Sequence, residues 1–134
     1  MSKQSPRAVV AGHAGFAAAM VDVVGRIAGN ADSLYAVSND GLDARGVEDA
    51  IRAALKRHGT SIVFTDLPAG SVAIAARRAA HSDSSISVVT GTTAAMLLDF
   101  VLGETMDAAA LERCAARGRD SIAVHAAKEV VRGD

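Results

Sequence analysis

The stretch that decides the fold reads Ala8-Val9-Val10-Ala11-Gly12-His13-Ala14-Gly15. Four consecutive apolar residues that end at a glycine are typical of a short strand buried on both faces. After the second glycine, apolar residues recur at helical spacing as far as Gly29-Asn30. The face expected to point inward holds Phe16, Met20, Val23, Val24 and Ile27. The stretch therefore predicts a strand that passes through a glycine-rich loop into a helix.

The same alternation of apolar run and helical pattern continues along the chain. Further strands are expected at 33–37, 61–65 and 85–90, with a final short one at 121–124, and helices at about 44–58, 70–81, 94–102 and 107–117. Asp43 and Thr93 are suited to cap two of these helices, and Gly59 and Gly103 to end them. The pattern predicts one α/β domain, whose open and mainly parallel sheet has helices on both faces. The last strand follows its helix after a very short turn, so it would pair antiparallel or with a second subunit.

The composition excludes several classes of protein. The 134 residues are 50% hydrophobic and carry a net charge of −1, which suits one folded domain and not a disordered chain. The 14 basic and 15 acidic residues balance, and only 3% are aromatic, which argues against nucleic-acid binding and stacking on bases or sugars. Cys114 stands alone, the first residues do not resemble a signal peptide, and no apolar run approaches the roughly 20 residues of a membrane span. We expect a cytoplasmic domain.

His13 is the most informative candidate for a functional residue. In an open parallel sheet, the site lies beyond the carboxyl ends of the strands, where the strand order reverses. His13 stands at such an end, between two glycines that allow a ligand to approach closely. The N–H groups at the start of the next helix, those of Ala14 and Gly15, favour a phosphoryl group carried on the histidine. The alternative is a histidine that only caps or packs at a loop.

Asp66 ends the third expected strand as His13 ends the first. If these strands are neighbours, the carboxylate can accept a hydrogen bond from one ring nitrogen and leave the other free as a nucleophile. The residues alone leave a second interpretation open, in which Asp66 caps the next helix. Ser71 would likewise cap that helix or donate to a phosphate oxygen. The same alternatives hold for Thr92 and Thr93, with capping favoured.

The residues offer little support for a metal or a nucleotide. The four histidines lack any His-x-x-x-His spacing, and a single cysteine cannot build a thiolate cluster, so we expect no metal site. Neither Gly-x-Gly-x-x-Gly after the first strand nor Gly-Lys-Ser/Thr is present. Dinucleotides and nucleotide triphosphates are therefore poor candidates for a ligand, and we expect no cofactor.

Three motifs together resemble the mannose-type IIA component of the bacterial sugar phosphotransferase system. They are Gly12-His13-Ala14-Gly15-Phe16-Ala17, Thr65-Asp66-Leu67 with Gly70-Ser71, and Gly91 with Met96-Leu97-Leu98. Their order and spacing agree with the family over residues 7–128. The turn Asn39-Asp40-Gly41 is similar to that of the amino-sugar, N-acetylgalactosamine-like branch. The resemblance implies a single phosphotransfer domain over 7–128, with tails at 1–6 and 129–134.

The resemblance also implies a function. In that family, the residue matched by His13 takes a phosphoryl group from the phosphocarrier protein HPr on Nε2 and passes it to a IIB domain, which serves the membrane subunits IIC and IID. Asp66 matches the aspartate that orients the histidine through Nδ1, and Ser71 with its loop, which includes Gly70, matches the contacts on the phosphate side. The family sheet has the order 2-1-3-4, and its last, antiparallel strand is exchanged across a homodimer.

The chain departs from the family at several positions. Ala14 stands where a second glycine is usual, Pro68 where an aromatic is usual, and Ala69 where a glycine is usual. These changes leave two alternatives beside the phosphoryl carrier. One is a regulatory module of the same fold that binds partners with reduced or lost transfer. The other is the phosphotransfer subunit of a dihydroxyacetone kinase.

Overall fold

The chain folds around a four-stranded parallel sheet. The computed structural model describes residues 6–127, so the expected tails lie outside the described residues except for Pro6, as does residue 128. The strands are β1 (Ala8–Gly12), β2 (Leu34–Ser38), β3 (Ile62–Thr65) and β4 (Ser87–Val89). The helices are α1 (Phe16–Ala28), the 3-10 turn η1 (Ala31–Ser33), α2 (Ala44–His58), α3 (Ser71–Ser82), α4 (Ala94–Leu102) and α5 (Ala108–Asp120).

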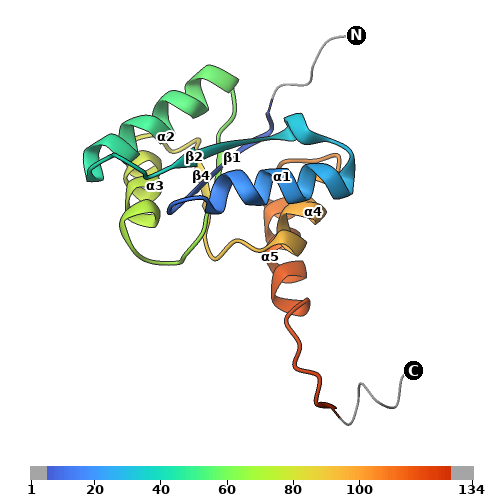
Figure 1. Cartoon of the computed structure of the whole chain (residues 1–134). Coiled ribbons are helices and arrows are strands. Elements are labelled where there is room, and N and C mark those ends of the chain that lie inside the picture. Colours follow the sequence, from blue (N-terminus) through green and yellow to red (C-terminus); the bar gives the residue numbers. More distant parts are fainter. Residues whose placement is uncertain (1–5, 128–134) are drawn as a thin grey trace.

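The strand order is β2-β1-β3-β4, and every neighbouring pair is parallel, as expected. Helices α2 and α3 pack together on one face of the sheet, while α1 and α4 contact each other on the opposite face and α5 packs on α4 (Figure 1). The central strand β1 pairs with β2 over its whole length and with β3 from Val9 to Ala11. The described chain is therefore the predicted α/β domain with helices on both faces.

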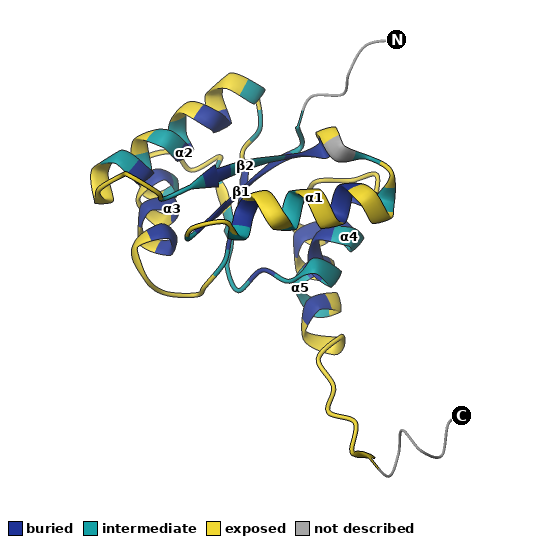
Figure 2. Ribbon diagram, in the orientation of Figure 1, coloured by how far each residue is buried: buried dark blue, intermediate teal, exposed yellow. Residues whose placement is uncertain are grey.

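Two hydrophobic cores lie on the two faces of the sheet (Figure 2). Because side chains alternate along a strand, β1 sends Ala8 and Val10 to one core and Val9 and Ala11 to the other. All five residues of β1 are buried, which explains its continuous apolar run. In the core under α1 and α4, the rings of Phe64 and Phe100 meet edge to face, with their centroids 5.1 Å apart.

The helix ends follow the predicted signals in most places. Asp43 accepts a hydrogen bond from the Gly46 N–H at 2.8 Å and Thr93 one from Met96 at 3.2 Å, which confirms both caps. Gly59 adopts the left-handed conformation that ends α2.

The expected inward face of α1 is partly wrong. Ala17 and Val24 are buried, but Val23 is 42% and Ile27 65% exposed. The stripe that packs on the sheet follows residues 17, 20, 21 and 24, and Val23 and Ile27 lie to one side of it.

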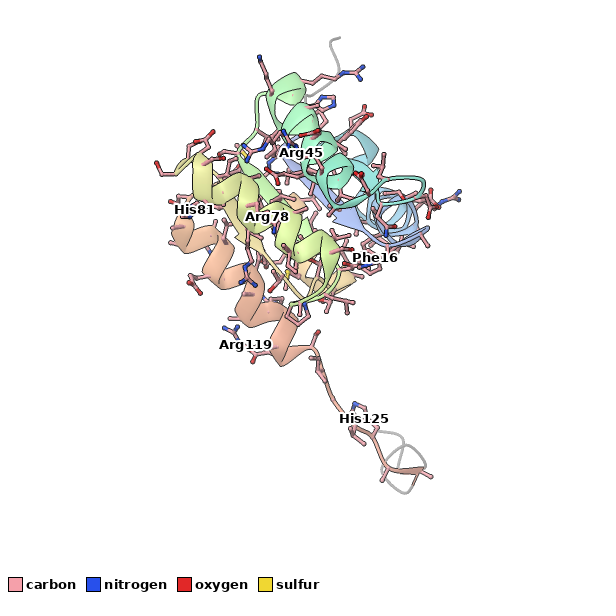
Figure 3. All side chains as sticks on the ribbon, turned by 90° about the vertical axis from the view of Figure 1, so that its left-hand side faces the viewer. Phe16, Arg45, Arg78, His81, Arg119 and His125 are labelled. Atoms are coloured by element: carbon pink, nitrogen blue, oxygen red, sulfur yellow. The ribbon has the colours of Figure 1, made fainter. Side chains whose placement is uncertain are left out.

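The final strand expected at 121–124 is absent from the described chain. Residues 122–126 form no regular structure and run away from the domain (Figure 1), where Figure 3 shows His125 apart from the sheet and helices. Ile122 is 73% and Val124 93% exposed. The reason is that a lone strand needs a neighbour for its backbone N–H and C=O groups, and this segment contacts no strand of its own chain.

Cys114 is buried on α5 against α4. Its thiol donates a hydrogen bond to Asp99 Oδ2 at 3.3 Å. Burial first, and then the hydrogen bond and negative charge of Asp99, raise the pKa of the thiol from 9.0 to about 12. The thiol therefore stays protonated and acts as part of the core. In the described part of the chain, no helix is long and apolar enough to cross a membrane.

Truncation of Phe100 tests the larger core. Phe100 is 1% exposed and contacts Phe64, so Phe100→Ala leaves a cavity and should lower the free energy of unfolding by about 3–5 kcal/mol. Leu102→Ala, two residues along α4, should cost less than about 0.5 kcal/mol because Leu102 is 69% exposed. Urea unfolding of both variants measures the difference, and equal losses would contradict the assignment of the core.

Candidate functional site

The site lies where the strand order reverses. The loop after β1 leads to α1 on one face of the sheet, and the loop after the neighbouring strand β3 leads to α3 on the other. The two loops diverge at the carboxyl end of the sheet, which is where open α/β folds place their sites. His13 follows β1 and Asp66 follows β3, so the topology places the two predicted residues side by side.

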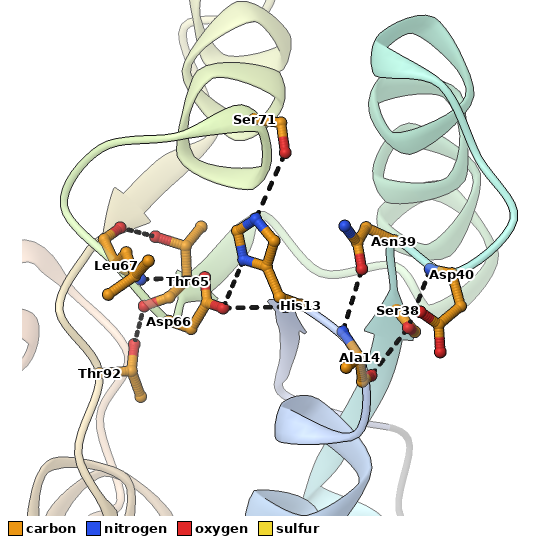
Figure 4. Close-up of polar contacts among 10 residues, drawn as sticks. All are labelled: His13, Ala14, Ser38, Asn39, Asp40, Thr65, Asp66, Leu67, Ser71 and Thr92. Carbon is orange, nitrogen blue, oxygen red and sulfur yellow. Dashed lines mark hydrogen bonds and ion pairs between the residues drawn. The ribbon is translucent and has the colours of Figure 1, made fainter.

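His13 is held by the carboxylate of Asp66. Asp66 Oδ2 lies 2.8 Å from His13 Nδ1 and also accepts the backbone N–H of His13 at 2.8 Å (Figure 4). The other oxygen, Oδ1, accepts the N–H of Leu67 at 2.9 Å. The carboxylate side chain is only 8% exposed, whereas the histidine side chain is 40% exposed. The ring is thus held at its Nδ1 edge and exposed at its Nε2 edge. The alternative role of Asp66, as a cap of α3, is wrong, because the N-cap of that helix is Gly70.

The charge state of Asp66 sets the histidine tautomer. Burial by itself raises the pKa of Asp66, but the hydrogen bonds and charge of His13 together with the Leu67 N–H outweigh it and hold that pKa below the usual 3.8. An ionised carboxylate only accepts hydrogen bonds, so Nδ1 must carry the hydrogen. The lone pair of the neutral ring is then on Nε2.

Nε2 points to the beginning of α3. Ser71 Oγ lies 3.4 Å from it (Figure 4), and a Cβ added to Gly70 would come within 3.9 Å of the ring carbon Cε1. Ser71 is the first residue of α3, and its side chain makes no capping hydrogen bond. Of its two predicted roles, capping is therefore wrong. Gly70 has φ +101°, a conformation that favours glycine, so the loop approaches the histidine edge without a side chain.

The two glycines beside His13 differ in their surroundings. A Cβ on Gly12 would lie 2.7 Å from Phe16 Cδ2 and 3.3 Å from Asp66 Cγ, so this position needs a glycine. A Cβ on Gly15 would meet nothing within 4 Å. Gly15 is the N-cap residue of α1, whose first N–H groups have no partner within the helix. The close approach expected of both glycines holds for Gly12, and Gly15 faces open space.

Sequence reasoning gave no role to two side chains at the end of β2. Asn39 Oδ1 accepts the N–H of Ala14 at 3.0 Å, and Ser38 Oγ donates to the Ala14 carbonyl at 2.8 Å. The Ala14 amide is therefore occupied in this structure. Ser38 is the last residue of β2, the strand that pairs with β1, and Asn39 follows it, and this position was the signal that could have found them.

The loop after β3 is hydrogen-bonded to the segment that follows β4. Thr92 Oγ1 donates to the Thr65 carbonyl at 2.6 Å, and Thr65 Oγ1 donates to the Leu67 carbonyl at 3.0 Å. Thr92 is 6% exposed and caps no helix, contrary to the favoured expectation. These bonds fix the backbone that carries Asp66. Among the described residues, no group of three or more His, Cys, Asp or Glu side chains could hold a metal ion.

Comparison with known families gives one clear match. The sequence model described as the PTS system fructose IIA component matches residues 7–117, which is most of the chain. No curated protein sequence matches the chain significantly.

Solved structures share the fold at low sequence identity. EIIA of Streptococcus agalactiae superimposes with a TM-score of 0.79 at 18% identity, over 88% of this chain and 95% of that one. The mannose/sorbose-specific IIA subunit of Enterococcus faecalis gives 0.77 at 18%, over 91% and 96%. The IIA protein associated with the fucose utilization operon of Streptococcus pneumoniae gives 0.77 at 19%, over 98% and 99%. These similarities show the fold.

The Asp66 contacts predict a dependence of stability on pH. The pKa of Asp66 is lowered in the folded protein, so its stabilising contribution is complete above the ordinary value of 3.8 and is lost as pH falls through the lower, folded-state pKa. Asp66→Asn should therefore have a lower free energy of unfolding than the unmodified chain at pH 7. The difference between the two proteins should become smaller as the pH falls below 3.8. Urea unfolding of both proteins between pH 7 and pH 2 measures this difference, and a difference that is larger at pH 2 than at pH 5 would contradict the assignment.

Proposed function

The chain belongs to the mannose-type IIA family of the sugar phosphotransferase system, and from this membership we propose that it is a cytoplasmic phosphoryl carrier with His13 as the residue that carries the group. It takes the phosphoryl group from phospho-HPr and passes it to a IIB domain, which serves the uptake of a sugar through the membrane subunits IIC and IID. The observation that carries the proposal is the geometry of the ring, with Nδ1 on Asp66 and Nε2 open toward Ser71.

The chemistry follows from that geometry. The lone pair on Nε2 of neutral His13 attacks the phosphorus of the donor phosphohistidine, a new P–N bond forms, and the donor P–N bond breaks. The donor ring leaves with the bonding electron pair. His13 keeps the hydrogen on Nδ1 and becomes positively charged, and the carboxylate of Asp66 neutralises that charge at 2.8 Å. Transfer to the IIB domain reverses these steps.

The phosphoryl oxygens need donors on the Nε2 side of the ring. Ser71 offers its hydroxyl, and the beginning of α3 offers N–H groups without helical partners, together with the positive end of the helix dipole. Gly70 brings this backbone close to the ring. The N–H at Gly15 is a further candidate, whereas the Ala14 N–H would first have to leave Asn39. We assign the phosphate-binding role chiefly to Gly70 and Ser71.

The altered loop after β3 is compatible with this chemistry. Pro68 and Ala69 are both exposed, and among the described residues Ala69 is not one of those with positive φ. The strain that an alanine would suffer in place of a glycine is thus avoided at this position. A regulatory module or a subunit of a dihydroxyacetone kinase would have the same fold, and the donor and acceptor of the phosphoryl group distinguish them from a sugar carrier.

Phosphoryl transfer is tested with the donor proteins. Incubation with enzyme I, HPr and phosphoenolpyruvate should label the chain with acid-labile phosphate, and His13→Ala should abolish the label. Asp66→Ala should remain folded but accept phosphate roughly 100-fold more slowly, because the ring loses its orientation. Rapid-quench labelling with radioactive phosphoenolpyruvate measures both rates.

The matched control for this experiment is His81→Ala. His81 is exposed at the far end of α3 and should label normally. Full labelling of His13→Ala would overturn the proposed carrier residue, and a normal rate for Asp66→Ala would remove the role of Asp66. A chain that no phosphoryl donor labels but that holds a stable partner would favour the regulatory module.

We also propose that the chain forms a homodimer by exchange of its last strand. The edge of the sheet at β4 adjoins α5, and between them lies a groove of about 490 Å³ lined by Ser87, Val88, Val89, Thr90, Ala108, Leu111, Glu112, Ala115 and Arg119. The exposed Ile122 and Val124 alternate as the residues of a half-buried strand do. The corresponding segment of a second copy, added antiparallel to β4, would complete the edge.

The oligomeric state tests this exchange. The full chain should sediment as a dimer, and Ile122→Asp with Val124→Asp should produce a monomer, because two carboxylates would replace the apolar side chains expected to pack against Val89 and Leu111 in the groove. Leu102→Asp is the control, since Leu102 is also largely exposed but lies outside the groove. A monomeric unmodified chain, or a dimer that survives the double substitution, would contradict the proposal.

A further inference from the structure

Ala14 holds an unusual backbone conformation next to the histidine. Its φ is +50°, and among the residues that the structure describes it is the one non-glycine residue with positive φ. In this left-handed region the Cβ of an alanine crowds its own backbone. Such a conformation persists only where surrounding contacts enforce it.

Two side chains at the end of β2 hold it from both sides. Asn39 Oδ1 accepts the Ala14 N–H at 3.0 Å, and Ser38 Oγ donates to the Ala14 carbonyl at 2.8 Å (Figure 4). The Ser38 oxygen in turn accepts the backbone N–H of Asp40 at 3.1 Å, which orients the hydroxyl. We call Ser38 and Asn39 the β2 clamp.

The β2 clamp also contacts Gly12, the residue that precedes His13. The backbone N–H of Asn39 donates to the Gly12 carbonyl at 3.2 Å, which continues the pairing of β2 with β1. The residues immediately before and after His13 are thus both bonded to the end of β2. On the opposite side, Asp66 holds the His13 N–H and Nδ1 from β3. His13 is therefore held between the ends of β2 and β3.

The conformation of Ala14 matters for the direction of the ring. The His13 carbonyl accepts the N–H of Phe16 at 3.0 Å, a turn that encloses Ala14 and Gly15 and leads into α1. If Ala14 relaxed to negative φ, this turn would open and the peptide after His13 would rotate. Asp66 would still bond the ring, but Nε2 would no longer be directed at Ser71. Small displacements of a reacting atom cost large factors in rate.

We propose that Ser38 and Asn39 are positioning residues for phosphoryl transfer, which hold Ala14 in its left-handed conformation and thereby aim His13 Nε2. This inference rests on the proposed carrier function. Neither side chain bonds the imidazole ring, so their effect passes through the backbone of the loop. The clamp has a simple consequence, because a glycine adopts positive φ without strain. With glycine at position 14, the loop should no longer need the clamp.

The test compares the rate of His13 phosphorylation in variants that have alanine or glycine at position 14. Asn39→Ala should slow phosphorylation of His13 by tenfold or more, and Asn39→Asp, which keeps an acceptor oxygen, should lose less than threefold. The rate of Ala14→Gly alone is the reference for the double variant, because this change removes only the Cβ of Ala14. Ala14→Gly combined with Asn39→Ala should recover to within threefold of Ala14→Gly, a rescue that a merely structural or docking role of Asn39 would not produce.

Phosphoramidate serves as the donor, because a small molecule does not depend on protein docking. Its P–N bond breaks as Nε2 forms the new one, and ammonia leaves. Ser38→Ala provides a second variant if Asn39→Ala does not fold, and Asp49→Ala, an exposed carboxylate on α2, is the control with an unchanged rate. A normal rate for Asn39→Ala, or a slow rate that Ala14→Gly fails to rescue, would overturn the clamp.

Failure of the clamp can be told from failure of the carrier function. If the unmodified chain accepts no phosphate on His13 from phosphoramidate or from HPr, the carrier function itself is wrong. The His13 ring is then followed by nitrogen-15 NMR, which reports its tautomer and environment without any phosphate. Asn39→Ala should shift the Nε2 resonance and Ala14→Gly should restore it, and an unperturbed resonance in Asn39→Ala would contradict the clamp independently of transfer.

Discussion

The carboxylate of Asp66 is the contact on which the site depends. It accepts three N–H groups, two from His13 and one from Leu67, at 2.8–2.9 Å. These bonds join the ends of β1 and β3 at the one place where the sheet reverses its order. The carboxylate side chain is only 8% exposed, so water has little access to it. One side chain therefore fixes the loop backbone, the ring orientation and the tautomer together.

The rest of the fold brings these strand ends into register. Strand β1 lies between β2 and β3, so the loop after it is bordered by the loops of both neighbours. Asn39 and Ser38 hold it from one side and Asp66 from the other. Thr92 extends the same support from the end of β4 through the backbone of Thr65. Four strand ends thus converge on one histidine.

Most of the fold was predictable, because buried strands and amphipathic helices leave clear periodic patterns. The segments that failed did so for tertiary reasons. Val23 and Ile27 match helical spacing, but only the packing of α1 decides which stripe is inside. The segment at 121–124 has strand composition, yet a strand also needs a neighbour. At the site, His13 and Asp66 were found because they end apolar runs. Asn39 resembled an ordinary turn residue, since no local pattern reveals a side chain that bonds across two loops.

The buried thiol of Cys114 makes the native chain resistant to alkylating reagents. A thiol with its pKa raised to about 12 and 2% exposure has almost no thiolate, and a reagent cannot reach it. Modification then requires α4 and α5 to separate. The one cysteine of the chain is consequently an intrinsic reporter of local opening, and its labelling rate in native conditions measures how often this pair of helices comes apart.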